Sequence, residues 1–278
     1  MSITTTPLKP NIGLEVTGMS GSDFVDEGVA DECRSALDRH GVLVYRDAHI
    51  SDPDLVAFSR LLGEVVVNRT GEHEYPEIAT ITLDVTKTNA VLAWYRQGNF
   101  LWHIDGATDQ LPQMATLLTA KEVADAGGET EFATTYAAWN ELPEAEKSEM
   151  AELRVVHSFA AAQERVHPDA SEAERAGWAR VPTRVHPLVW THRSGRQSLL
   201  LGATASEIVG WPKEKGAAFL DDLLAWSTRP QFVLRHQWRR GDLVIWDNTG
   251  MLHRAMPYES TSRRLMHRTT LVGVEPVA

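Results

Sequence analysis

The last third of the chain is crowded with short strand-like segments, and this pattern constrains the fold more than any other feature. Residues 231–237, 242–246 and 264–272 are apolar or alternating runs bounded by turn-forming or charged residues. Further strand-like runs are residues 42–46, 77–83, 115–120, 187–191 and 198–201. Few helical segments accompany them. The pattern predicts a mainly β protein with flanking helices (α+β), in which helices cover a sandwich or barrel core.

Four segments have a helical pattern. Residues 22–40 carry apolar residues every four positions, followed by the typical stop Gly41. These apolar residues are Val25, Val29, Cys33 and Leu37. Ser51, with Asp54 three residues later, resembles a capping box that opens a helix ending at Gly63. Residues 135–153 and 212–227 are also expected to be helical, since capping residues precede Leu- and Ala-rich faces.

Length and composition bound the kind of protein. The 278 residues contain no repeat or linker-like tract, so we expect a single domain over residues 1–278. The formal net charge of −11 argues against nucleic acid or an anionic membrane as a partner, because both need a basic face. No apolar run approaches the ~18–20 residues of a spanning helix, and residues 1–13 lack a signal peptide's apolar region. We expect a cytoplasmic homo-oligomer, either a dimer or a tetramer.

A histidine and an aspartate stand two positions apart at the end of an apolar run, residues 100–105 (FLWHID). If this run is extended, His103 and Asp105 point to the same side and offer two ligands to a metal ion. Taken alone, such a pair is more typical of a protein surface, so a third ligand is needed. His253 is the best candidate, because a buried strand and a polar turn deliver it. The other histidines have ordinary explanations; His157 and His236, for example, could alternate outward on strands.

Two arginines occupy alternate positions in the final strand-like segment. The face that they share also holds apolar residues, and its members are Arg264, Met266, Arg268 and Thr270. A guanidinium on a partly apolar face is costly unless an anion meets it. Because guanidinium suits two-pronged recognition of a carboxylate or sulfonate, this segment indicates an anion site. An exposed edge strand with scattered charge is the alternative interpretation.

Four blocks carry a family resemblance: WHID, GGETEF, WDNTGMLHR and RRLMHRTTL. Their order and spacing resemble those of the TauD/TfdA family of iron(II)- and 2-oxoglutarate-dependent dioxygenases. The family pattern is an HxD pair, a Thr or Ser about 25 positions later, a distant His, and an Arg some ten to thirteen positions beyond it. Here Thr130 follows Asp105 by 25 positions and Arg264 follows His253 by 11. The segments HPLVWTH and PQFVLRHQW extend the resemblance over most of the chain.

The resemblance implies a fold, an activity and a set of residue roles. The fold would be a double-stranded β-helix (jelly roll, cupin-like) core. His103, Asp105 and His253 would bind Fe(II) as a facial triad, which leaves positions for 2-oxoglutarate and O2. Thr130 and Arg264 would bind 2-oxoglutarate. The reaction would hydroxylate a small anionic substrate, a carboxylate or a sulfonate, with release of succinate and CO2.

The resemblance also assigns residues to the substrate. Arg268 matches the arginine that holds the substrate's anion, and Asn99 matches a position that lines the active site. Taurine dioxygenases carry a histidine as a second sulfonate ligand where this chain has Asn68, which puts taurine itself in doubt. The aromatic side chains Phe100, Trp94 and Tyr95 could line a larger pocket for an acid with an aromatic or alkyl body.

Two other functions remain open from the residues. A zinc hydrolase would also accept two histidines and a carboxylate, but it needs a general base and gives no role to Thr130 or the arginine pair. A non-catalytic jelly-roll binding protein, stabilised by its metal, would not turn over 2-oxoglutarate and would tolerate loss of Arg264.

Overall fold

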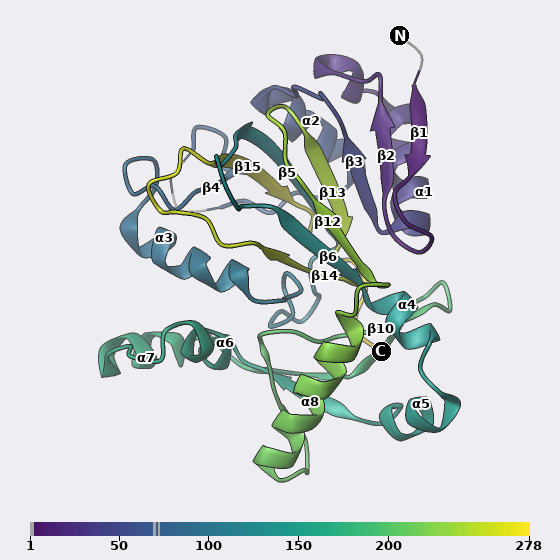
Figure 1. The fold of residues 1–278 in the computed structure, drawn as a ribbon, viewed down its shortest axis with the longest axis vertical. Coiled ribbons are helices and arrows are strands. Elements are labelled where there is room, and N and C mark those ends of the chain that lie inside the picture. The colour runs from purple at the N-terminus through teal and green to yellow at the C-terminus, as the bar shows by residue number, and fades with distance from the viewer. Residues whose placement is uncertain (1–2, 69–70, 72) are drawn as a thin grey trace.

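A seven-stranded sheet forms the centre of the molecule (Figure 1). The computed structural model describes residues 3–68, 71 and 73–278. In order across the sheet, the strands are β1 (Thr4–Pro7), β2 (Leu14–Thr17), β3 (Val42–Tyr45), β13 (Leu243–Asp247), β5 (Ala115–Glu122), β15 (Leu265–Thr270) and β4 (Ala79–Ile81). Strands β2 and β3 pair in parallel, and the other pairs of this sheet are antiparallel. The predicted strands of the C-terminal third thus pair with strands from the first half of the chain.

The central strands are buried on both faces. In β13, Leu243 and Ile245 belong to the apolar cluster on one face of the sheet, whereas Val244 and Trp246 belong to the cluster on the other. Strands β3 and β5 alternate in the same way. Burial on both faces explains why the sequence shows continuous apolar runs here rather than an alternation of apolar and polar residues.

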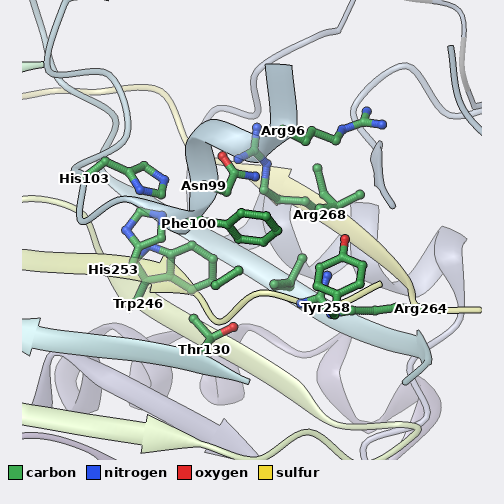
Figure 2. Close-up of a pocket in the computed structure, with 13 residues that line it drawn as sticks. Arg96, Asn99, Phe100, His103, Thr130, Trp246, His253, Tyr258, Arg264 and Arg268 are labelled. Carbon is green, nitrogen blue, oxygen red and sulfur yellow. The ribbon is translucent and has the colours of Figure 1, made fainter. Parts of the chain in front are cut away.

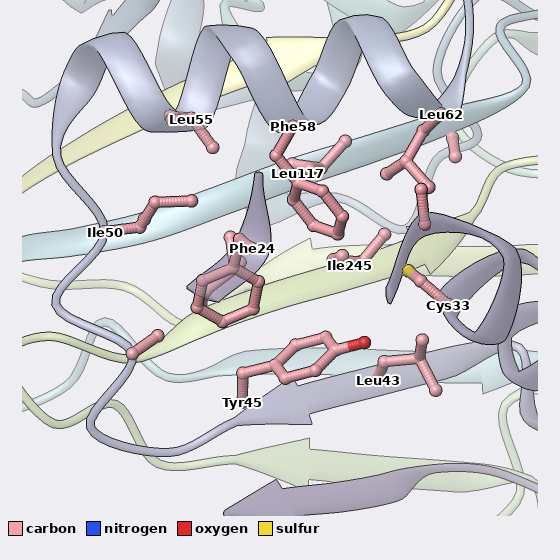
Figure 3. Close-up of a cluster of buried hydrophobic side chains, with 14 of the residues drawn as sticks. Phe24, Cys33, Leu43, Tyr45, Ile50, Leu55, Phe58, Leu62, Leu117 and Ile245 are labelled. Carbon is pink, nitrogen blue, oxygen red and sulfur yellow. The ribbon is translucent and has the colours of Figure 1, made fainter. Parts of the chain in front are cut away.

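Helices α1 (Glu27–His40) and α2 (Asp52–Leu62) cover the first face. Phe58 of α2 and Cys33 of α1 pack with Leu43, Leu117 and Ile245 from the sheet (Figure 3). The Ser51 cap is confirmed, since its side chain accepts a hydrogen bond from the Asp54 backbone N–H. These two helices form one outer layer of the protein.

A three-stranded sheet covers the second face, in the order β12 (Val233–His236), β6 (Thr130–Thr134) and β14 (Met251–Ala255). The apolar cluster between the two sheets takes Phe132, Leu234 and Met251 from the smaller sheet and Val244 and Met266 from the larger one. The two sheets therefore form a sandwich. Strand β14, which carries His253, was not among the predicted strands.

The rest of the described chain gathers at one end of the sandwich, mostly below the two sheets in Figure 1. Its helices are α3 (Ala90–Tyr95), η2 (Arg96–Phe100), α4 (Thr135–Asn140), α5 (Glu144–Met150), α6 (Phe159–Val166), α7 (Glu172–Trp178) and α8 (Lys213–Ser227), whereas the short η1 (Gly21–Phe24) packs with α2 on the first face. Its strands form a sheet of β11 (Ala205–Ile208), β7 (Arg154–His157) and β8 (Arg184–Pro187), and a pair of β9 (Val189–Thr191) and β10 (Gln197–Leu199). The whole is a mixed α+β fold.

Two predicted helices have different bounds in the structure. The helix predicted over residues 22–40 begins only at Glu27, because the Asp26 side chain caps it by accepting from the Val29 backbone N–H, while residues before it form the short η1. Gly41 ends it in the left-handed conformation, as predicted. The helix predicted over residues 135–153 is two helices, α4 and α5, because Pro143 interrupts the pattern. In the described ranges, no helix combines the length and the apolar character needed to cross a membrane.

Candidate active site

His103, Asp105 and His253 converge at one end of the sandwich. His253 lies on β14, and a single antiparallel bridge joins it to His103: each backbone N–H donates to the other residue's carbonyl, at 3.0 and 2.9 Å. The segment carrying His103 was predicted as an extended strand, but it pairs through this one residue only. Asp105 Oδ1 lies 3.8 Å from His103 Nε2, and Asp105 Oδ2 lies 3.7 Å from His253 Nε2.

His253 and Asp105 have the protonation states that a divalent metal requires. Burial, together with the neighbouring His103, lowers the pKa of His253 to about 3, so its imidazole is neutral. Burial alone would raise the pKa of Asp105, but Arg268 and the two histidines outweigh it and hold this pKa at about 2. A neutral imidazole and an ionised carboxylate are ready to coordinate without losing a proton.

Hydrogen bonds orient two of these ligands. His103 Nδ1 lies 2.8 Å from the Leu101 carbonyl oxygen and donates to it, which leaves the lone pair of Nε2 directed at the cluster. The Thr116 hydroxyl donates to Asp105 Oδ2 at 3.0 Å. One ligating atom from each of the three residues lies within 4.8 Å of the others. The donor set, its charge and its spacing therefore fit a divalent metal ion.

A second cluster of similar composition, Asp52, His73 and His267, lies outside this site. Lys121 Nζ and His267 Nδ1 approach Asp52 Oδ1 at 2.7 and 2.8 Å. His73 Nδ1 accepts from the Tyr75 backbone N–H, so its Nε2 carries the proton and faces Asp52 Oδ2 at 3.3 Å. The carboxylate is already neutralised by protein cations and donors. We interpret this cluster as a structural tie between α2, β5 and β15.

Arg264 lies at the inner end of the cavity and is 3% exposed. Its guanidinium packs over the Tyr258 ring, 4.8 Å from the ring centre. Within the described part of the chain, no carboxylate lies at ion-pair distance from it. Burial lowers the pKa of Arg264, because a guanidinium without a counter-charge is poorly stabilised there. Such an arrangement calls for an anionic ligand.

The Thr130 hydroxyl lines the same cavity and is held by Trp238. Trp238 Nε1 donates to Thr130 Oγ1 at 2.9 Å. An indole N–H can only donate, so the Thr130 oxygen acts as acceptor and its own proton remains available for a ligand. Thr130 and Arg264 are thus both prepared to donate hydrogen bonds to one anion.

Arg268 lines the same cavity, close to the metal cluster. Its Nη1 lies 3.7 Å from Asp105 Oδ2, and its Nε is buried without a hydrogen-bond partner in the described ranges. The Asp247 carboxylate does not pair with Arg268; it accepts hydrogen bonds from Thr249 and Tyr136. Arg268 therefore retains an unsatisfied donor near the metal cluster.

One cavity brings most of the predicted residues together (Figure 2). It contains about 530 Å³ of space, counted out to the solvent at its mouth. Its lining consists of Ile81, Arg96, Asn99, Phe100, His103, Leu118, Thr130, Trp246, His253, Ala255, Tyr258, Arg264 and Arg268. Figure 2 shows the two histidines at one end and Arg264 with Tyr258 at the other, with Phe100 between them. Among the residues that the structure describes, the lining includes three arginines and no carboxylate.

Other predicted residues lie elsewhere. Asn68 does not line this cavity; its side chain donates to the Glu77 carbonyl oxygen at 3.3 Å. Trp94 stacks on His167, with ring centres 3.7 Å apart, and Tyr95 packs on Phe159, so neither lines the cavity.

His157 and His236, which were expected to point outward, are 0% and 2% exposed. His157 packs beside the Thr204 hydroxyl, and His236 beside the Asp242 carboxylate.

Several lining residues were missed from the sequence. Arg96 belongs to η2, the 3-10 turn that also carries Asn99 and Phe100. Tyr258 lies in the connection between β14 and β15. Its position in the sequence, between His253 and Arg264, could have indicated that it lies near the cavity. Nothing local marks Arg96 as part of a site.

Comparisons with known proteins agree with this geometry. The family described as "Taurine catabolism dioxygenase TauD, TfdA family" matches residues 4–270. The chain is 34% identical over 285 residues to an alpha-ketoglutarate-dependent 2,4-dichlorophenoxyacetate dioxygenase of Burkholderia sp. (strain RASC), covering 98% of this chain and 95% of that protein. It is 29% identical over 278 residues to an alpha-ketoglutarate-dependent sulfate ester dioxygenase of Pseudomonas putida, covering 98% and 90%. A crystal structure of AAD-2 in complex with Mn(II) and N-oxalylglycine matches with a TM-score of 0.82, at 29% identity and over 100% of both chains.

Proposed function

The chain belongs to the TauD/TfdA family of α-ketoglutarate (2-oxoglutarate)-dependent dioxygenases, and we propose that it hydroxylates a small carboxylate or sulfonate anion. In this proposal Fe(II) is held by His103, Asp105 and His253. The co-substrates are 2-oxoglutarate and O2, and the co-products are succinate and CO2.

The buried guanidinium of Arg264 is the observation that carries this proposal. It lies in the same cavity as the metal cluster, beside the Thr130 hydroxyl, and lacks a carboxylate partner in the described ranges. A dicarboxylate that reaches the metal with one end would place its far carboxylate against Arg264 and Thr130. Guanidinium binds such a group with two parallel hydrogen bonds.

The substrate would occupy the part of the cavity nearer Arg268. The buried, unpaired Nε of this residue and its neighbour Asn99 offer donors to an anionic group. Phe100, Leu118 and Ile81 line an apolar wall beside them. This arrangement favours a carboxylate or sulfonate on an aromatic or alkyl body. The relative named for 2,4-dichlorophenoxyacetate supports a carboxylate head group, and the relative named for sulfate esters supports a sulfur oxyanion, the class to which sulfonates belong.

The residues of the chain have distinct tasks in the reaction. Bound Fe(II) supplies the activation of O2 and the oxidative decarboxylation of 2-oxoglutarate. His103, His253 and the ionised Asp105 would hold the metal, while Arg264 and Thr130 orient the co-substrate. Arg268 holds the substrate anion, so that one C–H bond of its body lies near the metal cluster. The apolar wall excludes water from this region.

Two further readings accompany the proposal. We interpret the facing seven- and three-stranded sheets as a jelly-roll core that forms one domain. A zinc hydrolase is disfavoured, because none of the described residues that line the cavity carries a carboxylate that could act as a general base for water.

The test is succinate release under O2, with Fe(II) and 2-oxoglutarate, across phenoxyacids, sulfonates, alkyl sulfates and amino-acid derivatives. We expect succinate release to be stimulated by members of one anionic class and to vanish in His103→Ala, Asp105→Ala and His253→Ala, with the fold retained by circular dichroism. Full turnover by His253→Ala would refute the assignment of the metal site.

A further inference from the structure

A chain of hydrogen bonds connects the metal cluster to the turn after β13. Trp246 Nε1 donates to Asn248 Oδ1 at 2.9 Å, and Asn248 Nδ2 donates to Thr116 Oγ1 at 2.9 Å. The Thr116 hydroxyl then donates to Asp105 Oδ2 at 3.0 Å. Trp246, Asn248 and Thr116 are 2%, 0% and 0% exposed. Water therefore does not compete for these bonds.

The pairing of β5 with β13 brings the hydrogen-bonded residues together. Thr116 of β5 is the direct partner of Trp246 on β13. Asn248 lies in the turn directly after β13, and its amide oxygen faces the Trp246 indole. The Asn248 backbone N–H donates to the Met114 carbonyl oxygen at 3.0 Å, which keeps this residue against β5.

The available protons allow only one donor-to-acceptor direction for this series of hydrogen bonds. An indole N–H can only donate, so the Asn248 atom that faces Trp246 must be the carbonyl oxygen. The amide nitrogen of Asn248 then faces Thr116 and donates to it. The Thr116 hydroxyl has one proton, and it is directed at Asp105.

This direction matters for the metal ligand. Asp105 Oδ2 receives the Thr116 proton and faces Arg268 Nη1, whereas Oδ1 receives no hydrogen bond from the described residues. A carboxylate fixed in this way offers Oδ1 to a metal and cannot rotate freely.

We propose that Asn248 is a positioning residue for the metal site, which acts through the Thr116 hydroxyl to hold the Asp105 carboxylate for a divalent metal. The proposal rests on the assignment of His103, Asp105 and His253 as metal ligands. Outer hydrogen-bond partners of metal ligands typically change metal affinity by ~10–100-fold. Neither Asn248 nor Thr116 touches the substrate cavity, so their effect is on metal binding.

The experiment measures Mn(II) affinity of the full-length protein by titration, using the electron paramagnetic resonance signal of free Mn(II). Thr116→Val removes the hydroxyl with little change in shape, and Asn248→Leu removes the amide. We expect each to weaken Mn(II) binding about 10-fold. Thr116→Ser, which keeps the hydroxyl, should remain within about 2-fold of the wild type. Thr119→Val is the matched control, since it removes a buried hydroxyl from β5 at a position that faces the other side of the sheet.

The double variant separates positioning from a general structural role. If Asn248 acts through Thr116, adding Asn248→Leu to the Thr116→Val variant should weaken Mn(II) binding by less than about 2-fold. The proposal would be overturned if the two substitutions weakened Mn(II) binding independently, so that their fold-losses multiplied in the double variant. It would also be overturned if Thr116→Val left the Mn(II) affinity unchanged. Circular dichroism and melting temperature check folding. If Asn248→Leu does not fold, the near-isosteric Asn248→Asp enters the same cycle, where its coupling to Thr116→Val gives the same decision. A wild-type protein that binds no Mn(II) would instead refute the metal site itself.

Discussion

Trp238 Nε1 donates a 2.9 Å hydrogen bond to Thr130 Oγ1, so the threonine proton points away from the indole and is free for a ligand. We therefore expect Trp238→Phe, which keeps an aromatic ring but removes the donor, to weaken 2-oxoglutarate binding by roughly 3-fold, or ~0.6 kcal/mol. The measurement is anaerobic titration of the visible absorption band of the complex with Fe(II) and 2-oxoglutarate. Thr130→Val should weaken binding by a similar amount and add little in the Trp238→Phe background. Fully additive effects would contradict this relationship.

The Arg264 guanidinium should be the main determinant of 2-oxoglutarate affinity. Arg264→Lys retains the charge but loses the two-pronged geometry of the guanidinium. In the described ranges, no protein carboxylate lies at ion-pair distance from this side chain. We expect at least a ~10-fold loss of affinity, or ~1.4 kcal/mol, in the same titration. Unchanged affinity would reject the role of this residue.

Arg268 should act on the substrate rather than on 2-oxoglutarate. Arg268→Ala removes the buried, unpaired Nε donor from the cavity lining, so the substrate's C–H bond is no longer held near the metal. We expect nearly unchanged 2-oxoglutarate binding, weaker substrate binding and more succinate formed per hydroxylated product. The ratio of succinate to product measures this coupling, and Arg264→Lys serves as the comparison. Loss of 2-oxoglutarate binding as severe as in Arg264→Lys, with coupling unchanged, would remove the main support for an anionic substrate.

The Asp52 cluster should contribute stability that depends on pH. Burial opposes ionisation of Asp52, but hydrogen bonds and charges from His267 and Lys121 outweigh it and hold the pKa well below the usual range. A depressed folded-state pKa stabilises the protein above the unfolded pKa of about 4, and this contribution is lost as the pH falls through the folded pKa. Asp52→Asn should therefore cost about 1 kcal/mol at neutral pH, after allowance for solvent screening.

The difference between wild type and Asp52→Asn should shrink as the pH falls below about 4. Urea unfolding at several pH values measures it. A difference that stays constant down to the acid range would show that the charge of Asp52 does not stabilise the fold. Retained activity of Asp52→Asn at neutral pH would agree with a structural rather than catalytic cluster.

The sequence by itself determined the family, the candidate metal ligands and the central strands. Three spacings can be read from the sequence alone: the HxD pair, the later Thr130, and the interval between His253 and Arg264. The continuous apolar runs of β5 and β13 were also readable, because a strand buried on both faces has no polar alternate positions. The Ser51 cap was also predictable from the sequence, because capping depends on residues only three positions apart.

The tertiary structure alone decided which distant side chains meet. Trp238 reaches Thr130 across 108 positions and Asn248 reaches Thr116 across 132. These contacts depend on strand order and register, because a shift of one residue would turn the strand residues Thr130 and Thr116 to the opposite face of their sheets. The same holds for Asn68, which was assigned to the substrate but bonds to Glu77, and for Arg96, which enters the cavity. Local periodicity encodes which face a residue occupies along its own strand, whereas the partner across the sandwich is set only when the two sheets pack.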